Sequence, residues 1–132
     1  MVHVDEIQFD AMIAKAMDEL PQAYISGLQN VVIVVDNEPT PEQRQRQNLH
    51  PSQTLLGLYE GIPLTRRGSN YNLVLPDKIT LFKTPLEHTS STISELQENI
   101  KRTLWHEIAH FYGLEHDRIH HLEQKSKKMI RH

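Results

Sequence analysis

Residues 106–116 have the sequence HEIAHFYGLEH, and the rest of the chain is organised around this stretch. On an α-helix, residues four positions apart lie on the same face, so His106 and His110 can present two imidazole nitrogens to one ion. Glu107 lies about 100° around the helix from His106, within reach of a water molecule held by that ion. The spacing therefore predicts a metal-binding helix with a carboxylate beside the metal.

A third metal ligand is expected just after this helix. Gly113 can adopt the left-handed conformation that ends many helices, so the chain can reverse there and return His116 toward the metal. Catalytic zinc has three protein ligands and one open position, whereas structural zinc has four ligands, usually including cysteine. The chain contains no cysteine. We therefore expect one Zn²⁺ ion bound by His106, His110 and His116, with Glu107 as the general base.

Length and composition are those of one soluble domain. The chain has 132 residues, and its hydrophobic content of 38% and charged content of 23% are typical of globular proteins. A net charge of −3 gives no overall attraction to nucleic acid or to an anionic membrane. The first residues, MVHVDE, lack the basic start and apolar core of a signal peptide, and no apolar run reaches membrane-spanning length. We expect a single domain over residues 1–132, located in the cytoplasm.

Hydrophobic periodicity predicts helices and strands around the metal-binding stretch. Apolar residues at three- and four-residue steps predict helices over residues 6–20 and 92–111, the second capped by Thr92. Short helical turns are expected at residues 21–28 and 41–47. The β-branched run at residues 31–35 is typical of a strand buried on both faces, which we place at the centre of the sheet.

The remaining segments are expected to be shorter elements and loops. Residues 55–59 and 62–65 flank Glu60-Gly61 and predict a hairpin, and residues 79–82 predict another strand. Residues 71–75 are expected to be extended. Residues 84–91 are predicted to form a loop with His88 on the surface, and Asp117 can cap a final helix.

The motif resembles the extended zinc-binding pattern of the metzincins. Metzincins, however, carry a methionine turn and a sizeable subdomain after the third ligand, and only residues 117–132 follow here. The chain is more similar to the bacterial zincin-like metallopeptidases, sometimes called minimal zincins, over almost its whole length. Besides the opening helix, the resemblance is carried by VVIVVDNEP (31–39), LGLYEGIPLT (56–65), LPDKITLF (75–82) and HEIAHFYG (106–113).

This resemblance implies an α+β fold in which a small mixed sheet packs against the zinc-binding helix and the N-terminal amphipathic helix. It also implies metallopeptidase activity. Some members of the family carry an acidic residue where His116 stands, so Asp117 is the alternative third ligand.

The expected reaction is metal-assisted hydrolysis of a peptide or protein substrate. Zinc lowers the pKa of its bound water, and Glu107 takes a proton from that water and passes it to the leaving amine. Tyr112 is a weak candidate for a donor to the developing oxyanion, and we expect it to be a packing residue. Three further weak candidates are Tyr71, His120 and His121, and none of the four is placed in the catalytic set.

Two alternative functions remain open. A bacterial endoribonuclease family has three histidines at this spacing, but it carries a small residue at the position of Glu107. The other alternative is a zinc-stabilised interaction domain whose site no longer catalyses a reaction. Glu107 favours the peptidase over both.

Overall fold

The structure is a computed structural model that describes residues 1–49, 54–62 and 76–113. In chain order the elements are α1 (Glu6–Glu19), α2 (Gln22–Ser26), β1 (Val31–Asp36), α3 (Pro41–Arg46), β2 (Gly57–Glu60), β3 (Asp77–Phe82), α4 (Lys83–His88) and α5 (Ile93–Phe111). The three strands form a mixed sheet in the order β1-β3-β2, in which β1 is parallel and β2 antiparallel to β3. The expected α+β fold with a small mixed sheet is therefore confirmed. Within these ranges, every helix is too short or too polar to cross a lipid bilayer.

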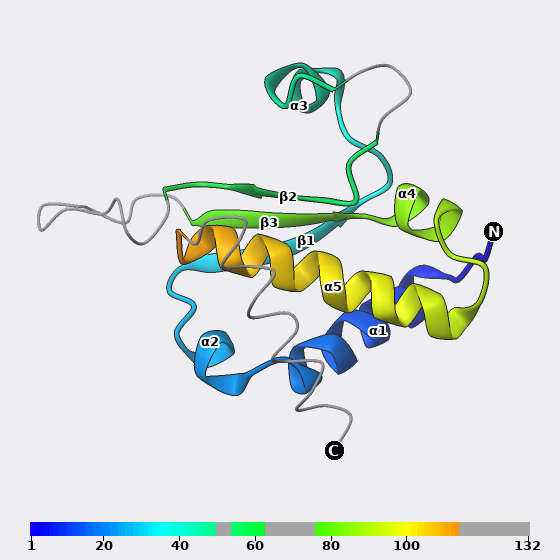
Figure 1. The fold of residues 1–132 in the computed structure, drawn as a ribbon, viewed down its shortest axis with the longest axis horizontal. Helices are drawn as coiled ribbons and strands as arrows, with labels where there is room; N and C mark the ends of the chain where they lie inside the picture. Colours follow the sequence, from blue (N-terminus) through cyan, green and yellow to red (C-terminus); the bar gives the residue numbers. More distant parts are fainter. Residues whose placement is uncertain (50–53, 63–75, 114–132) are drawn as a thin grey trace, which may run out of the picture.

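The helices lie in layers on the two sides of the sheet. Helix α5 runs along one face of the sheet, and α1 lies beside α5 on the same side, whereas α3 lies on the opposite side (Figure 1). The core fills the space between the two long helices and the inner face of β3. Its fully buried side chains include Phe9 and Ala16 of α1, Ile79 and Leu81 of β3, and Leu96, Ile100, Leu104 and Ile108 of α5. The apolar stripe predicted for residues 92–111 thus forms the centre of the core.

The central strand of the described sheet is β3, so the prediction that residues 31–35 form the central strand is wrong for this part of the chain. On β3 the side chains of both faces are buried. Ile79 and Leu81 face α5, and Phe82 lies on the other face. Strand β1 lies at an edge of the described sheet, and Val32 on its outer face is 41% exposed. A β-branched run has the same composition in a central strand and in an edge strand, so only the pairing partners reveal the position.

The helices predicted within the described residues are confirmed, but the loop predicted at residues 84–91 is wrong. The chain forms α4 there, which ends at His88, and His88 is exposed as expected. Pro85 lies in the first turn, where its missing N–H group costs no helical hydrogen bond. Leu86 is fully buried in the core and holds the short helix against the rest of the protein. Tertiary burial, which local sequence does not reveal, stabilises this element.

The strand predicted at residues 55–59 is present as β2, and its partner in the described sheet is β3. Ile62, the start of the second predicted hairpin arm, does not lie in a strand. The rest of that arm, the extended segment at residues 71–75 and the helix predicted after Asp117 lie outside the described residues. The described residues therefore contain the first arm of the predicted hairpin and only the first residue of the second arm.

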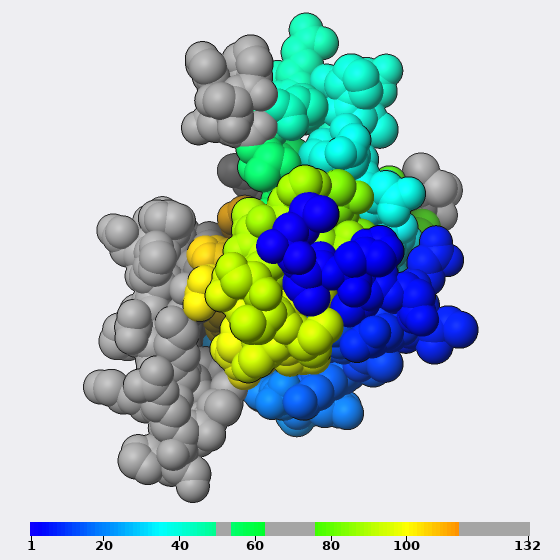
Figure 2. Space-filling view, turned by 90° about the vertical axis from the view of Figure 1, so that its right-hand side faces the viewer, coloured from blue at the N-terminus to red at the C-terminus, as the bar shows by residue number. Residues whose placement is uncertain are grey.

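The N-terminal segment is fixed to α4 by a buried carboxylate. Figure 2 shows the first residues, in dark blue, lying against the yellow-green surface of α4 and the start of α5. One oxygen of Glu87 accepts hydrogen bonds from the Val4 N–H group (2.9 Å) and from Lys83 Nζ (3.1 Å), and it lies 3.0 Å from His3 Nδ1. Burial alone raises the pKa of Glu87, but the hydrogen bonds from Val4 and Lys83 and the nearby positive charges lower it below its ordinary value.

Strand β2 approaches α5 so closely that only glycine fits at the contact. A Cβ atom added to Gly57 would lie 2.6 Å from Thr103 Cγ2 and 3.3 Å from Glu107 Cγ. It would also lie 3.2 Å from the carbonyl oxygen of Thr80 on β3, which cannot move aside easily. A glycine inside a strand often marks such a close approach. The backbone of β2 therefore packs directly on the turn of α5 that carries Glu107.

Replacing Glu87 with glutamine removes the negative charge from its buried network. We expect Glu87→Gln to lower the free energy of unfolding by about 1–3 kcal/mol at neutral pH, because Lys83 then stays buried without its carboxylate. The folded-state pKa of Glu87 is below the ordinary value of 4.5. Its contribution is therefore present above that value and is lost as the pH falls through the folded-state pKa.

Denaturant unfolding at a series of pH values measures the difference in the free energy of unfolding between wild type and Glu87→Gln. We expect this difference to shrink as the pH is lowered. Glu38→Gln changes an exposed loop residue and serves as the matched control, expected to stay within about 0.5 kcal/mol of wild type. A difference between wild type and Glu87→Gln that is the same at every pH would contradict the assigned network.

Adding a methyl group at Gly57 tests the contact between β2 and α5. We expect Gly57→Ala to lower the free energy of unfolding by about 1–3 kcal/mol, because the strand and the helix must move apart. The second substitution Thr103→Ser removes the nearest clashing atom, so the double variant should recover part of the loss. Thermal and denaturant unfolding of both single variants and the double variant measure the effect. Wild-type stability in Gly57→Ala would show that β2 does not pack this tightly.

Candidate metal site

The helix that carries the proposed ligands is fixed at both ends. At its start, Thr92 Oγ1 accepts a hydrogen bond from the Glu95 N–H group at 3.0 Å, which satisfies one of the free amides of the first turn. At its end, Gly113 has a φ angle of +72°, and its N–H group donates to the carbonyl oxygen of His110 at 2.9 Å. The predicted left-handed turn at Gly113 is thus confirmed.

His106 and His110 lie on successive turns of α5, at the border between core and solvent. Both belong to the continuous helix Ile93–Phe111, so their four-residue spacing places them on one face. His106 is partly buried, whereas the side chain of His110 is 50% exposed. Leu104 and Ile108, on the inner face, are fully buried. Burial of the inner face thus holds the helix in place while His110 remains exposed on the outer face.

Glu107 lies between the two histidines in sequence but points toward the sheet. It is only 7% exposed, and its side chain lies at the close contact with Gly57 of β2. Its Oε1 atom lies 3.2 Å from His110 Nδ1. This hydrogen bond raises the pKa of His110, burial of the ring opposes the shift, and the negative charge of Glu107 adds to it. The carboxylate is therefore held at the boundary of the core with one oxygen directed at a proposed ligand.

The donor types in this region fit zinc, although the described residues contain only part of the proposed ligand set. Imidazole nitrogen and carboxylate oxygen are common zinc ligands in proteins. Within residues 1–49, 54–62 and 76–113, no group of three or more His, Cys, Asp or Glu side chains is close enough together to hold a metal ion. His116 and Asp117, the two candidates for the third ligand, lie outside the described residues. Of the proposed site residues, the structure places the side chains of Glu107 and His110 in contact, and His106 lies one turn before His110 on α5.

Tyr112 has a structural role, as expected from its sequence position. Its hydroxyl group donates a hydrogen bond to the carbonyl oxygen of Tyr24 at 2.6 Å. The two rings also pack edge to face with their centroids 5.2 Å apart. Tyr112 thus ties the end of α5 to α2. The other weak candidates for an oxyanion donor, Tyr71, His120 and His121, lie outside the described residues.

The edge strand beside Glu107 is a feature of the site that the sequence motif does not locate. Strand β2 has β3 as its neighbour on one side and forms the other edge of the described sheet. Along it, Gly57 contacts the turn of Glu107, and the ring of Tyr59 packs against Phe111 with centroids 6.3 Å apart. The glycine inside an apolar strand pattern is the available signal, because such a glycine indicates close backbone approach.

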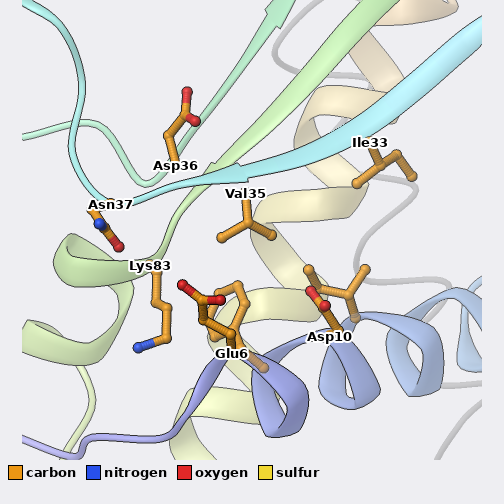
Figure 3. Close-up of a pocket in the computed structure, with 9 residues that line it drawn as sticks. Glu6, Asp10, Ile33, Val35, Asp36, Asn37 and Lys83 are labelled. Atoms are coloured by element: carbon orange, nitrogen blue, oxygen red, sulfur yellow. The ribbon is translucent and has the colours of Figure 1, made fainter.

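A separate pocket of about 490 Å³ lies between α1 and β1, away from the two histidines. Figure 3 shows Glu6 and Asp10 projecting from α1 toward β1, with Val35 facing them and Lys83 at one end. The amino group of Lys83 is already hydrogen-bonded to Glu87. None of the proposed zinc ligands lines this pocket, so it is not part of the candidate site.

Comparison with known proteins identifies both the fold and the family. The structure is similar to that of a conserved hypothetical protein from Thermo thermophilus, with a TM-score of 0.53 and 20% sequence identity, over 94% of this chain and 99% of that chain. No curated protein matches the sequence. Residues 28–126, more than half of the chain, match the family described as zincin-like metallopeptidase. The chain therefore belongs to the zincin-like metallopeptidase family.

Proposed function

We propose that this protein is a zinc-dependent metallopeptidase that hydrolyses peptide bonds in a peptide or protein substrate. The observation that carries the proposal is the position of Glu107. Its carboxylate lies next to the imidazole of His110 and directly beside the edge strand β2. A general base must lie within reach of both the metal and the substrate, and this position is beside one proposed ligand and beside the strand edge proposed to bind the substrate. Membership in the zincin-like family supports the same interpretation.

Three imidazoles would hold the ion in this proposal, those of His106, His110 and His116. When bound, zinc acts as a Lewis acid and lowers the pKa of a water molecule toward neutrality. The contact between His110 Nδ1 and Glu107 Oε1 favours the tautomer with hydrogen on Nδ1, which leaves Nε2 as the ligand atom. Glu107 would thus orient one ligand through its first oxygen.

We assign the proton transfer to the second oxygen of Glu107. That oxygen takes the proton from the attacking water and delivers it to the leaving amine, so one carboxylate serves both steps. Its burial against β2 limits its motion, which keeps the oxygen near the reacting carbonyl.

The edge strand β2 supports a peptide as the substrate. A strand edge can pair with an extended peptide through backbone hydrogen bonds. Since Gly57 of β2 contacts the turn that carries Glu107, a peptide paired with this edge would pass close to the carboxylate. The sequence expectations of a single domain over residues 1–132 and of a cytoplasmic location are retained as parts of this proposal.

Removing the charge of Glu107 tests the assigned general base. Glu107→Gln should retain one zinc ion per chain but cleave a peptide library about 10²–10⁴-fold more slowly, because the amide cannot accept the proton. Zinc stoichiometry checks that the metal is retained, and library digestion checks that cleavage is slower, each measured side by side with wild type. Glu38→Gln is the matched control. Unchanged turnover would reject the assigned role. Cleavage of structured RNA that persists in Glu107→Gln would instead support an endoribonuclease.

The third ligand is tested by two alanine variants at adjacent positions. His116→Ala should weaken zinc binding by at least about 100-fold, because the ion loses one of its three protein ligands. Asp117→Ala is the matched control and should retain wild-type affinity. Competition with a chromogenic chelator measures both affinities. The opposite result, with loss of affinity only in Asp117→Ala, would move the third ligand to Asp117.

A further inference from the structure

A second hollow follows the seam between α5 and the start of β2. Its volume is about 520 Å³, and it lies on the N-terminal side of His106 along the helix. The residues that line it and that matter here are Leu56, Glu95, Glu98, Asn99 and Arg102. Leu56 directly precedes Gly57, which contacts Thr103 and Glu107. The hollow is therefore an extension of the seam that leads to the proposed general base.

Arg102 is the charged residue of this hollow that lies nearest to the proposed ligands. It precedes His106 by four residues in the same continuous helix, so the two side chains lie on one face about 6 Å apart along the axis. Glu98 and Glu95 lie one and two turns further away from His106. Counted outward from Glu107, an extended peptide that lies along this seam would therefore pass Arg102 before either carboxylate.

The guanidinium of Arg102 is available to a ligand, whereas the neighbouring polar side chains of Glu98, Glu95 and Asn99 are engaged. Glu98 pairs with Lys101 at 3.5 Å, and Glu95 Oε1 accepts a hydrogen bond from the Ser91 N–H group at 3.4 Å. The amide of Asn99 is likewise engaged, since it donates to Ser90 Oγ at 2.9 Å. Arg102 is exposed, and within the described parts of the chain its side chain has no hydrogen-bond or ion-pair partner.

We propose that Arg102 is a specificity-determining residue that binds an aspartate or glutamate side chain of the substrate near the scissile bond. The inference rests on the proposed peptidase function, because the subsite is defined by its distance from the metal-binding turn. A guanidinium is always charged and can bind a carboxylate through two parallel hydrogen bonds. Arg102 and His106 are one helical turn apart, and an extended peptide rises about 3.3 Å per residue. The acidic residue of the substrate would therefore lie one to three positions from the cleaved bond.

The carboxylates of Glu98 and Glu95, which lie beyond Arg102, limit the preference for acidic residues to one position of the substrate. Glu98 and Glu95 would repel a second acidic residue placed further along the seam, since like charges at short range are unfavourable. The preferred substrate therefore has one acidic residue close to the cleaved bond and neutral or basic residues beyond it. An acidic run would be a poor substrate.

Matched peptides that differ only by Glu or Gln at each position within three residues of the cleaved bond test this inference. With zinc-loaded wild type at low salt, kcat/KM should favour the Glu peptide about three- to fivefold at one position, and the preference should shrink as salt is added. Arg102→Gln should remove the preference, Arg102→Glu should reverse it toward a Lys peptide, and Arg102→Lys should retain part of it. Lys15→Gln removes an exposed positive charge from α1 and should leave the ratio unchanged.

The outcomes separate this inference from the proposed function. Cleavage of both peptides at equal rates by wild type would overturn the role of Arg102 and leave the peptidase standing. Absence of cleavage by wild type would reject the peptidase instead. Binding of the same fluorescent peptides to zinc-loaded Glu107→Gln, measured by anisotropy, then decides the role of Arg102. A Glu preference that disappears in the Glu107→Gln/Arg102→Gln double variant supports the role, and equal binding of both peptides overturns it.

Discussion

The close packing of β2 on α5 is the contact on which the rest of the candidate site depends. At Gly57 the backbone of an edge strand lies directly against the side chains of Thr103 and Glu107 on α5. This contact brings together three things that separate parts of the sequence supply: a strand edge, a carboxylate and a helix face with two histidines. Without it, the histidine pair would lie on a helix surface with no adjacent strand edge for the proposed peptide substrate.

Helix α5 contributes to both the core and the candidate site. Its inner face packs in the core, and its outer face carries His106 and His110. Leu96, Ile100, Leu104 and Ile108 are fully buried against α1 and the sheet, which fixes the rotation of the helix about its axis. That rotation determines where His106 and His110 point. Glu107 lies at the border, buried like a core residue but hydrogen-bonded to His110. A change in the packing of the inner face would therefore alter the geometry of the outer one.

Much of the fold can be predicted from sequence because its main elements have strong local signals, whereas the candidate site also depends on contacts between distant segments. The stripes of α1 and α5, the cap at Thr92 and the turn at Gly113 follow from local spacing, as does the common helix face of the motif. Strand order and the burial of Leu86 depend on distant residues, so local sequence misplaces residues 31–35 and predicts a loop at α4. The approach of β2 and the hollow beside Arg102 likewise arise where separate segments meet. The glycine in β2 gives a partial signal, but it does not identify the partner of the close contact.

The fixed position of α5 also bears on how the proposed zinc ion would be taken up. Because the core already fixes the helix, binding of zinc by the two proposed ligands on it would cost little backbone conformational entropy. This differs from a zinc finger, in which the metal itself drives folding. Under the proposed function, a chelator would then remove the activity while leaving the hydrophobic core intact, so metal supply would act as a reversible control on turnover and not on the lifetime of the protein.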